Sequence, residues 1–302
     1  MPSRRGVLRR GAGLFVAGSA AGVGALAVRS NADDTNADGQ TASDGSAADA
    51  DGPTDRERGR ATVLVAGSLQ QIATKVGAAS VEAHGSVACR RLLEDGLRDP
   101  DAVALADPRL FSGLTDRVTC FATNALVVAL REDLADEYDD WRALVSDSDR
   151  TLGRTDPERD PLGYRTVMAL RLADRNGGGI DAEAVLDRTN VFPETGLLRT
   201  LEAGGIDAAF AYRNMAVEHD LPSLALPDRI DFSNPEFADD YARASVELND
   251  RTVTGAPIRY AANARTPRGE EWVEKLTGAI ETLETRGFGI PDSYPRQIDV
   301  SE

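Results

Sequence analysis

The sequence predicts an α/β fold for residues 61–302. Short apolar segments, typical of buried strands, alternate with segments in which apolar residues recur at helical spacing. Such alternation favours a sheet with parallel character that is covered by helices. Of the 302 residues, 41% are hydrophobic, which is enough for a sizeable core and excludes wholesale disorder.

Residues 1–30 have the pattern of a twin-arginine export signal. The basic stretch SRRGVLRR precedes a Gly- and Ala-rich apolar stretch from Gly11 to Val28, with Ala25-Leu26-Ala27 as a candidate cleavage site. A single membrane anchor is the alternative, so cleavage and retention both stay open. Residues 31–60 are acidic and almost free of large apolar side chains, which predicts a disordered linker. We therefore expect an extracellular protein, with or without a membrane tether.

The first part of the body shows seven apolar or amphipathic segments. The apolar stretch 61–66 predicts a buried strand, because Gly67-Ser68 ends it. Ser86 is expected to cap a helix, because Val87, Cys89 and the leucines that follow recur at helical spacing. The other expected elements are a helix over 70–76, a strand near 80–83, a strand over 102–106, one long strand over 121–130 and a helix from Trp141 to Val145.

The remainder of the chain continues the alternation. Helical spacing through Val167, Leu170 and Leu172 predicts a helix over 163–176. The further expected elements are a helix over 195–203, strands over 206–212 and 257–262, and one long amphipathic helix from about Gly269 to Arg286.

Charge and residue usage exclude several classes of function. The 34 Lys and Arg against 50 Asp and Glu give a net charge of −16, so a broad nucleic-acid-binding surface is not expected. Lysine occurs only at positions 75 and 275, and an acidic surface with arginine in place of lysine indicates a halophilic organism. His84 and His219 are the only histidines, which excludes a histidine-rich metal site, and both are expected on the surface. The sequence lacks a G-x-S-x-G elbow and any dinucleotide or Walker fingerprint, so catalysis has little support.

Small or polar residues follow several strands and immediately start helices. Such junctions occur at Gly67-Ser68, Gly85-Ser86, Asp160-Pro161 and Glu194-Thr195-Gly196. In open α/β sheets ligands bind at the carboxyl ends of strands, where helix N-termini present unpaired N–H groups and partial positive charge. Each serine by itself is as well explained as a helix cap, but the series predicts an anion site that needs no lysine.

A series of motifs runs along the body in order: VAGSL at 65–69, GSVACR at 85–90, FATN at 121–124, DPLGYR at 160–165, LLRTLEAGGIDAAFAYR at 197–213 and AVEH at 216–219, with the stretches 221–227 and 256–260. In these motifs the body resembles the molybdate/tungstate-binding proteins of ABC importers, especially their archaeal branch. The resemblance implies a two-lobed clamshell of the type II periplasmic-binding-protein kind, with mixed sheets and helices on both faces. One lobe would comprise 61–122 and 249–302 and the other 123–248, with crossovers at 121–130 and near 246–248.

The resemblance also implies which residues bind the oxyanion between the lobes. Ser68 and Ser86 would lie on one lobe, and Asp160, Tyr212 and the helix start at Thr195 on the other. The archaeal proteins commonly have a glutamate just before this tyrosine, which joins the aspartate in coordinating the metal, whereas this chain has Ala211. We therefore expect a tetrahedral oxyanion held by hydrogen bonds.

The expected partners follow from the same resemblance. They are molybdate or tungstate and the permease subunits of an ABC importer, with a monomeric binding protein and no cofactor. Another anion such as sulfate or phosphate, or a small solute, is the near alternative; a secreted enzyme or a passive surface protein is a more distant one. Cys89 and Cys120 either form a disulfide or remain two buried thiols.

Overall fold

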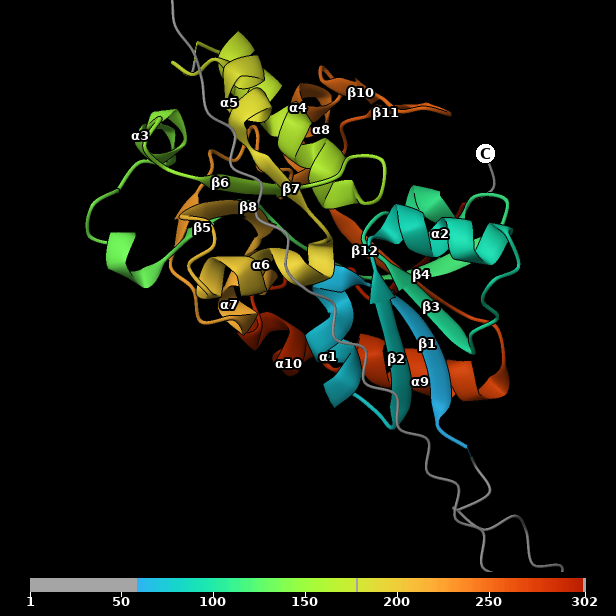
Figure 1. The fold of residues 1–302 in the computed structure, drawn as a ribbon. Coiled ribbons are helices and arrows are strands. Elements are labelled where there is room, and N and C mark those ends of the chain that lie inside the picture. Colours follow the sequence, from blue (N-terminus) through green and yellow to red (C-terminus); the bar gives the residue numbers. More distant parts are fainter. Residues whose placement is uncertain (1–58, 178, 301–302) are drawn as a thin grey trace, which may run out of the picture. The chain divides into compact units, whose positions relative to one another are not determined.

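The computed structural model describes residues 59–177 and 179–300 (Figure 1). The predicted export signal, and the predicted acidic linker up to residue 58, lie outside the described residues. In the described part the strands form a six-stranded sheet, a five-stranded sheet and a two-stranded hairpin, with helices around both larger sheets. The predicted α/β class is therefore confirmed.

The six-stranded sheet has the order β13-β4-β12-β3-β1-β2. Its strands are β1 (Ala61–Ala66), β2 (Ala79–His84), β3 (Ala102–Leu105), β4 (Arg117–Thr123), β12 (Arg259–Ala264) and β13 (Arg296–Asp299). β1 pairs in parallel with β2 and β3, whereas β12 and β13 add antiparallel pairs. Helices α2 (Ser86–Glu94) and α9 (Pro267–Gly278) both pack against β1. This coverage explains why β1 and β3 are almost continuously apolar and buried.

The five-stranded sheet has the order β7-β6-β8-β5-β9. Its strands are β5 (Leu126–Leu130), β6 (Leu152–Thr155), β7 (Asn190–Phe192), β8 (Ala208–Tyr212) and β9 (Ser223–Ala225). β6 pairs in parallel with β7 and β8, and β5 runs antiparallel to β8 and β9. Helices α4 (Pro161–Arg175) and α6 (Glu194–Glu202) pack on β6 and β8, and α4 is buried along most of its length. The hairpin comprises β10 (Ser245–Glu247) and β11 (Thr252–Thr254).

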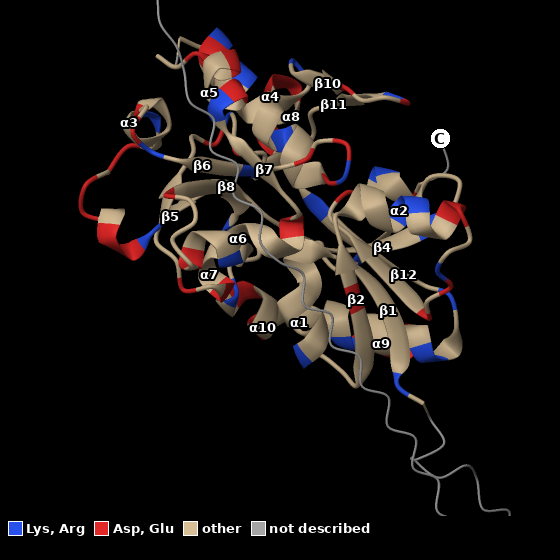
Figure 2. Ribbon diagram, in the orientation of Figure 1, with Lys and Arg blue, Asp and Glu red and all other residues tan. Residues whose placement is uncertain are grey.

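The other helices are short. They are α1 (Gln70–Lys75), α3 (Trp141–Ser146), α5 (Ala182–Arg188), α7 (Arg213–Glu218), α8 (Ala238–Tyr241) and α10 (Ile280–Thr285), with 3-10 turns η1 (Gly67–Leu69), η2 (Pro108–Phe111), η3 (Glu132–Leu134) and η4 (Pro235–Phe237). Figure 2 shows charged residues mainly on helices and loops, while the strands are largely uncharged. Within the described residues, no helix combines the length and apolar character needed to cross a bilayer.

The apolar stretch 121–130 forms two strands, so the prediction of one long strand is wrong. β4 ends at Thr123 in the six-stranded sheet and β5 begins at Leu126 in the five-stranded sheet. Asn124 and Ala125 carry the chain across, and the Asn124 Oδ1 atom accepts the Ala125 N–H at 2.9 Å. A buried strand in either sheet has the same apolar pattern, so hydrophobicity alone does not reveal the change of sheet. Residues 246–248, where a second crossover was expected, belong to the β10–β11 hairpin. The chain rejoins the six-stranded sheet further on, at β12.

The predicted helix over 269–286 is also divided. α9 ends at Gly278 and α10 begins at Ile280, because Ala279 leaves the helical region with φ −81° and ψ 46°. Glycine at 278 favours such a break, since it loses more backbone entropy in a helix than other residues do. Trp272, Leu276 and Leu283 are nevertheless all buried, so the apolar pattern that predicted one helix spans the two.

Cys89 and Cys120 are both free and buried, so the structure has the two-thiol alternative. The Cys89 Sγ donates to the Val65 carbonyl at 3.4 Å, and burial raises the pKa of both thiols. We expect thiol titration in denaturant, without reductant, to count two reactive thiols. In the native protein the reaction should be slow, because both thiols are buried and largely protonated. Detection of two thiols only after reduction would contradict this expectation.

Candidate functional site

Four of the five predicted site residues are buried where helix starts of the two sheets meet. Ser68, Ser86, Asp160 and Tyr212 are each at most 1% exposed. The approach of the two sides is close: a Cβ added to Gly85 would lie 2.5 Å from the Arg159 carbonyl oxygen, and the Ala88 N–H donates to that oxygen at 3.0 Å. The structure thus brings these residues together from segments far apart in the chain.

Ser68 lies in η1, directly after β1. Its Oγ accepts a hydrogen bond from the Tyr260 hydroxyl at 3.1 Å, and its carbonyl accepts from the Asn214 side-chain amide at 2.7 Å. Tyr260 belongs to β12 of the same sheet, whereas Asn214 belongs to α7 at the end of β8. Both the hydroxyl and the backbone of Ser68 are therefore held by neighbours.

Ser86 is the first helical residue of α2, and the prediction that it caps this helix is wrong. Gly85 occupies the N-cap position, and no side-chain cap bond is formed. Glycine is required there because a side chain would collide with the backbone at Arg159. The Ser86 Oγ instead accepts the N–H of Ala106, just after β3, at 3.1 Å.

Asp160 is the N-cap of α4. Its Oδ1 accepts from the Gly163 N–H at 2.9 Å and from the Thr155 hydroxyl at 2.8 Å. Burial raises the pKa of Asp160 to about 7, although these hydrogen bonds oppose the rise. Asp160 thus bonds to the backbone of its own helix, and its Cβ lies against the start of α2, 2.7 Å from where a Gly85 Cβ would be.

Glu194, the first residue of α6, is the site residue that the sequence analysis missed. It is 4% exposed, and its Oε2 accepts the Gly67 N–H across the interface at 2.9 Å. Burial, with the nearby charge of Asp160, raises the pKa of Glu194 to about 8. The Oε1 atom has no hydrogen-bond partner among the described residues. The helix start at Glu194-Thr195-Gly196 was predicted, but the family resemblance pointed to Thr195 as the site residue.

The site therefore contains two buried carboxyl groups. The expectation of a tetrahedral, hydrogen-bonded anion rested on Ala211, which lies in β8, is fully buried and pairs with Val127 of β5. Glu194 supplies a second buried carboxyl group from another helix, and the expected coordination stays a prediction. The sequence alone did not reveal that the start of α6, at Glu194, faces Gly67 and Ser68.

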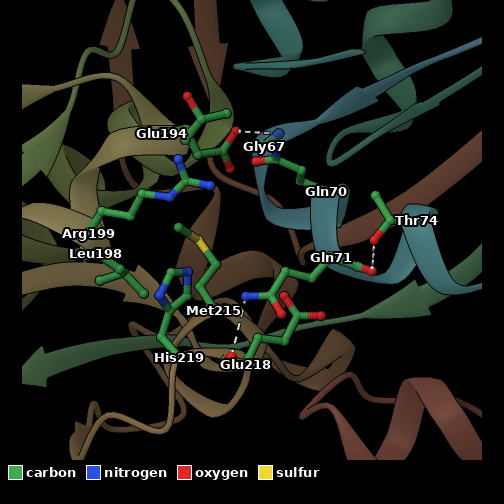
Figure 3. Close-up of a pocket in the computed structure, with 11 residues that line it drawn as sticks. Gly67, Gln70, Gln71, Thr74, Glu194, Leu198, Arg199, Met215, Glu218 and His219 are labelled. Carbon is green, nitrogen blue, oxygen red and sulfur yellow. Dashed lines mark hydrogen bonds between the residues drawn. The ribbon is translucent and has the colours of Figure 1, made fainter. Parts of the chain in front are cut away.

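Thr195 lies one residue further along α6 and is only half-buried. It lines a cavity of about 220 Å³ between α1 on one side and α6 and α7 on the other (Figure 3). Glu194 and Gly67 line the same cavity, which therefore borders the buried cluster. Its wall also holds Glu218, whose pKa burial raises to about 7 against the opposing charge of Arg286.

Tyr212 ends β8 and is fully buried. Its hydroxyl oxygen accepts from the Arg165 guanidinium at 2.8 Å, and the same Nη1 donates to the Ala106 carbonyl at 3.0 Å. Burial alone would raise the pKa of Asp107, but the charges of Arg109 and Arg165 hold it well below its usual range. Arg165 thus places a permanent positive charge beside the cluster. This arginine belongs to the DPLGYR motif but was not among the predicted site residues.

The arrangement is suited to bind an anion. Three hydroxyl groups can donate hydrogen bonds, a buried guanidinium offsets negative charge, and the two carboxyl groups can either be neutral donors or act as metal ligands. Across residues 59–177 and 179–300, no group of three or more His, Cys, Asp or Glu side chains is arranged to hold a metal cation. His84 and His219 instead pair with Glu82 and Glu202.

The chain is similar to known solute-binding proteins. Residues 62–285 match the family model of the bacterial extracellular solute-binding proteins. The chain is 45% identical over 255 residues, 78% of this chain and 83% of the other, to a putative ABC transporter molybdenum-binding protein of Haloferax volcanii. It is 32% identical over 216 residues, 59% of this chain and 63% of the other, to the molybdate/tungstate-binding protein WtpA of Pyrococcus abyssi.

A solved structure supports the fold. The periplasmic molybdate-binding protein of Azotobacter vinelandii superposes with a TM-score of 0.56 at 15% identity, covering 77% of this chain and all of that one. This likeness supports the predicted clamshell class. The family-model match over residues 62–285 gives the assignment. The chain belongs to the bacterial extracellular solute-binding protein family.

Proposed function

We propose that this protein is the solute-binding component of an ABC importer and that it captures molybdate or tungstate. The family membership and the names of the relatives support a transport role with an oxyanion ligand. The observation that carries the proposal is the buried cluster of hydroxyl and carboxyl groups between helix starts of the two sheets. A binding role needs no chemical step, so we propose no catalytic residue.

The proposed ligand set is Ser68, Ser86, Asp160 and Tyr212, with Glu194 added and Thr195 in the wall of the neighbouring cavity. In this proposal residues 61–122 and 249–302 form one lobe and residues 123–248 the other. Contacts such as Gly67 N–H to Glu194 would then hold the lobes together around the anion. An anion that contacts both lobes favours the closed form by its differential affinity.

The coordination of the bound metal is expected to involve both carboxylates. Glu194 Oε2 is held by Gly67, but Oε1 is buried without a partner and is free to become a metal ligand. We therefore expect X-ray absorption on the bound molybdate to show six oxygen neighbours, and five in the Glu194→Gln variant, which keeps the Asp160 carboxylate. Four oxygens in the unchanged protein would instead support the hydrogen-bonded tetrahedral geometry.

Calorimetric titration tests the proposed function directly. The full chain would be titrated in high salt with molybdate, tungstate, sulfate and phosphate under otherwise identical conditions. We expect saturable binding of molybdate and tungstate at a stoichiometry of one, with sulfate and phosphate weaker. Preference for sulfate or phosphate would refute the molybdate and tungstate assignment while leaving an anion carrier, and the absence of any binding would refute both.

The cellular setting is part of the same proposal. The amino-terminal pattern supports export by the twin-arginine pathway and an extracellular location, with a retained anchor as the form that stays membrane-tethered. The acidic, arginine-rich composition supports a halophilic source. We propose that a monomer delivers the oxyanion to the permease subunits.

A further inference from the structure

Each of the three hydroxyl groups in the buried cluster accepts a hydrogen bond from a neighbouring group. Ser86 Oγ accepts from the Ala106 N–H at 3.1 Å, and Tyr212 Oη accepts from Arg165 at 2.8 Å. Backbone N–H and guanidinium groups only donate, so the direction of both bonds is fixed. The hydroxyl proton in each case must therefore point elsewhere.

The third hydroxyl, that of Ser68, is held by a group that can both donate and accept. Tyr260 donates to the Ser68 Oγ at 3.1 Å, and the Tyr260 oxygen accepts from the Asn124 Nδ2 at 3.3 Å. The Asn124 amide cannot be reversed without loss, because its Oδ1 accepts the Ala125 N–H at 2.9 Å and its Nδ2 also donates to Asn214 at 2.7 Å. The Ala125 N–H thus fixes the Asn124 amide, which donates to the Tyr260 oxygen and leaves the Tyr260 proton for the Ser68 Oγ.

We propose that Tyr260, oriented by Asn124, is a positioning residue that turns the Ser68 proton toward the bound oxyanion. The proposal rests on the proposed function, because it concerns the same site. The oxygens of a fully ionised oxyanion only accept hydrogen bonds, so a serine serves such a ligand only when its proton faces it. With the Tyr260 proton on one lone pair of Ser68 Oγ, the serine proton is directed away from Tyr260.

The surroundings of Ser68 support this direction. The Glu194 carboxyl group lies beside Ser68, because its Oε2 accepts the N–H of the adjacent Gly67 at 2.9 Å and its Oε1 is buried without a hydrogen-bond partner. A carboxylate oxygen and an oxyanion oxygen are both acceptors. The same proton orientation therefore suits the anion that we propose for this site.

The Tyr260 hydroxyl can be removed with little disturbance of packing. The ring is fully buried, with centroids 5.3 Å from Phe288 and 6.2 Å from Phe121, and phenylalanine would keep these contacts. Asn124 would keep its bond to Asn214. Tyr241 in α8 offers a matched control, because it is equally buried and its hydroxyl bonds to Asp228 and Asn234, which are not part of the cluster.

A double-mutant cycle on the full chain tests the proposal. Molybdate affinity would be measured by calorimetry for the unchanged protein, Tyr260→Phe, Ser68→Ala and the double variant, with Tyr241→Phe as the control in both backgrounds. We expect Tyr260→Phe to weaken binding on the order of tenfold in the unchanged background and less than about twofold when Ser68 is already alanine. Tyr241→Phe should leave the affinity unchanged in both.

The outcomes separate the inference from the proposed function. Equal losses for Tyr260→Phe in the two backgrounds, or no loss in either, would overturn the positioning role while the anion site stands. Failure of the unchanged protein to bind molybdate or tungstate would overturn the proposed function and the inference together. Thermal melting of all variants separates stability from binding. A general loss of folding would lower the molybdate affinity of both tyrosine variants alike.

Discussion

Replacing Ser68 and Ser86 together by alanine is expected to weaken molybdate binding by about a hundredfold or more. A hydrogen bond to a charged acceptor contributes roughly 1.5–3 kcal/mol, and about 1.4 kcal/mol corresponds to a tenfold change in affinity. Each single variant should therefore lose on the order of tenfold or more. The dissociation constants would be measured by calorimetric titration at constant high salt.

An exposed serine provides the control for this pair. Ser80 lies in β2 with its residue exposed, and Ser80→Ala should leave the affinity unchanged. Unchanged affinity in both Ser68→Ala and Ser86→Ala would show that the anion binds elsewhere. A loss confined to one serine would place the anion against only one of the two helix starts.

The Glu194→Gln variant is expected to remove a large pH dependence of folding stability. Burial raises the pKa of Glu194 from an ordinary value near 4.5 to about 8, so between these pH values the folded protein binds more protons than the unfolded chain. Stability then falls as pH rises through this window. At about 1.4 kcal/mol for each unit of pKa, the loss is on the order of a few kcal/mol, or roughly 5–10 °C in melting temperature.

Thermal melting from pH 5 to 9 in buffer without oxyanions measures this effect. The unchanged protein should lose melting temperature steeply with rising pH, and Glu194→Gln should lose distinctly less, because its amide does not ionise. The exposed Glu183 supplies the control, since Glu183→Gln should follow the unchanged protein. Parallel curves for all three proteins would contradict the raised pKa of Glu194. Asp160 still titrates in every variant, so some pH dependence should remain.

Much of the architecture could be predicted from the sequence, because it depends on local pattern. The apolar stretch before Gly67-Ser68 is a buried strand in the structure, and the segments at Ser86, Pro161 and Glu194 do begin helices. Four of the five predicted site residues are buried in one cluster for the same reason, since strand ends followed by helix starts gather at one edge of a sheet. Hydropathy and turn residues are enough to predict such junctions.

Only the tertiary structure decided which side chains complete the site. The apolar pattern did not reveal the change of sheet at Asn124-Ala125 or the break at Ala279, because buried apolar residues lie on both sides of each. Glu194, Arg165 and Tyr260 reach the cluster from three different elements, and each is ordinary in its local sequence. A buried carboxyl group or a directed hydrogen bond is defined by its neighbours in space, and those neighbours come from segments as far apart as Gly67 and Glu194. The sequence by itself determined where the helix starts of the candidate site form, and chain packing determined which charges and hydroxyl groups face one another there.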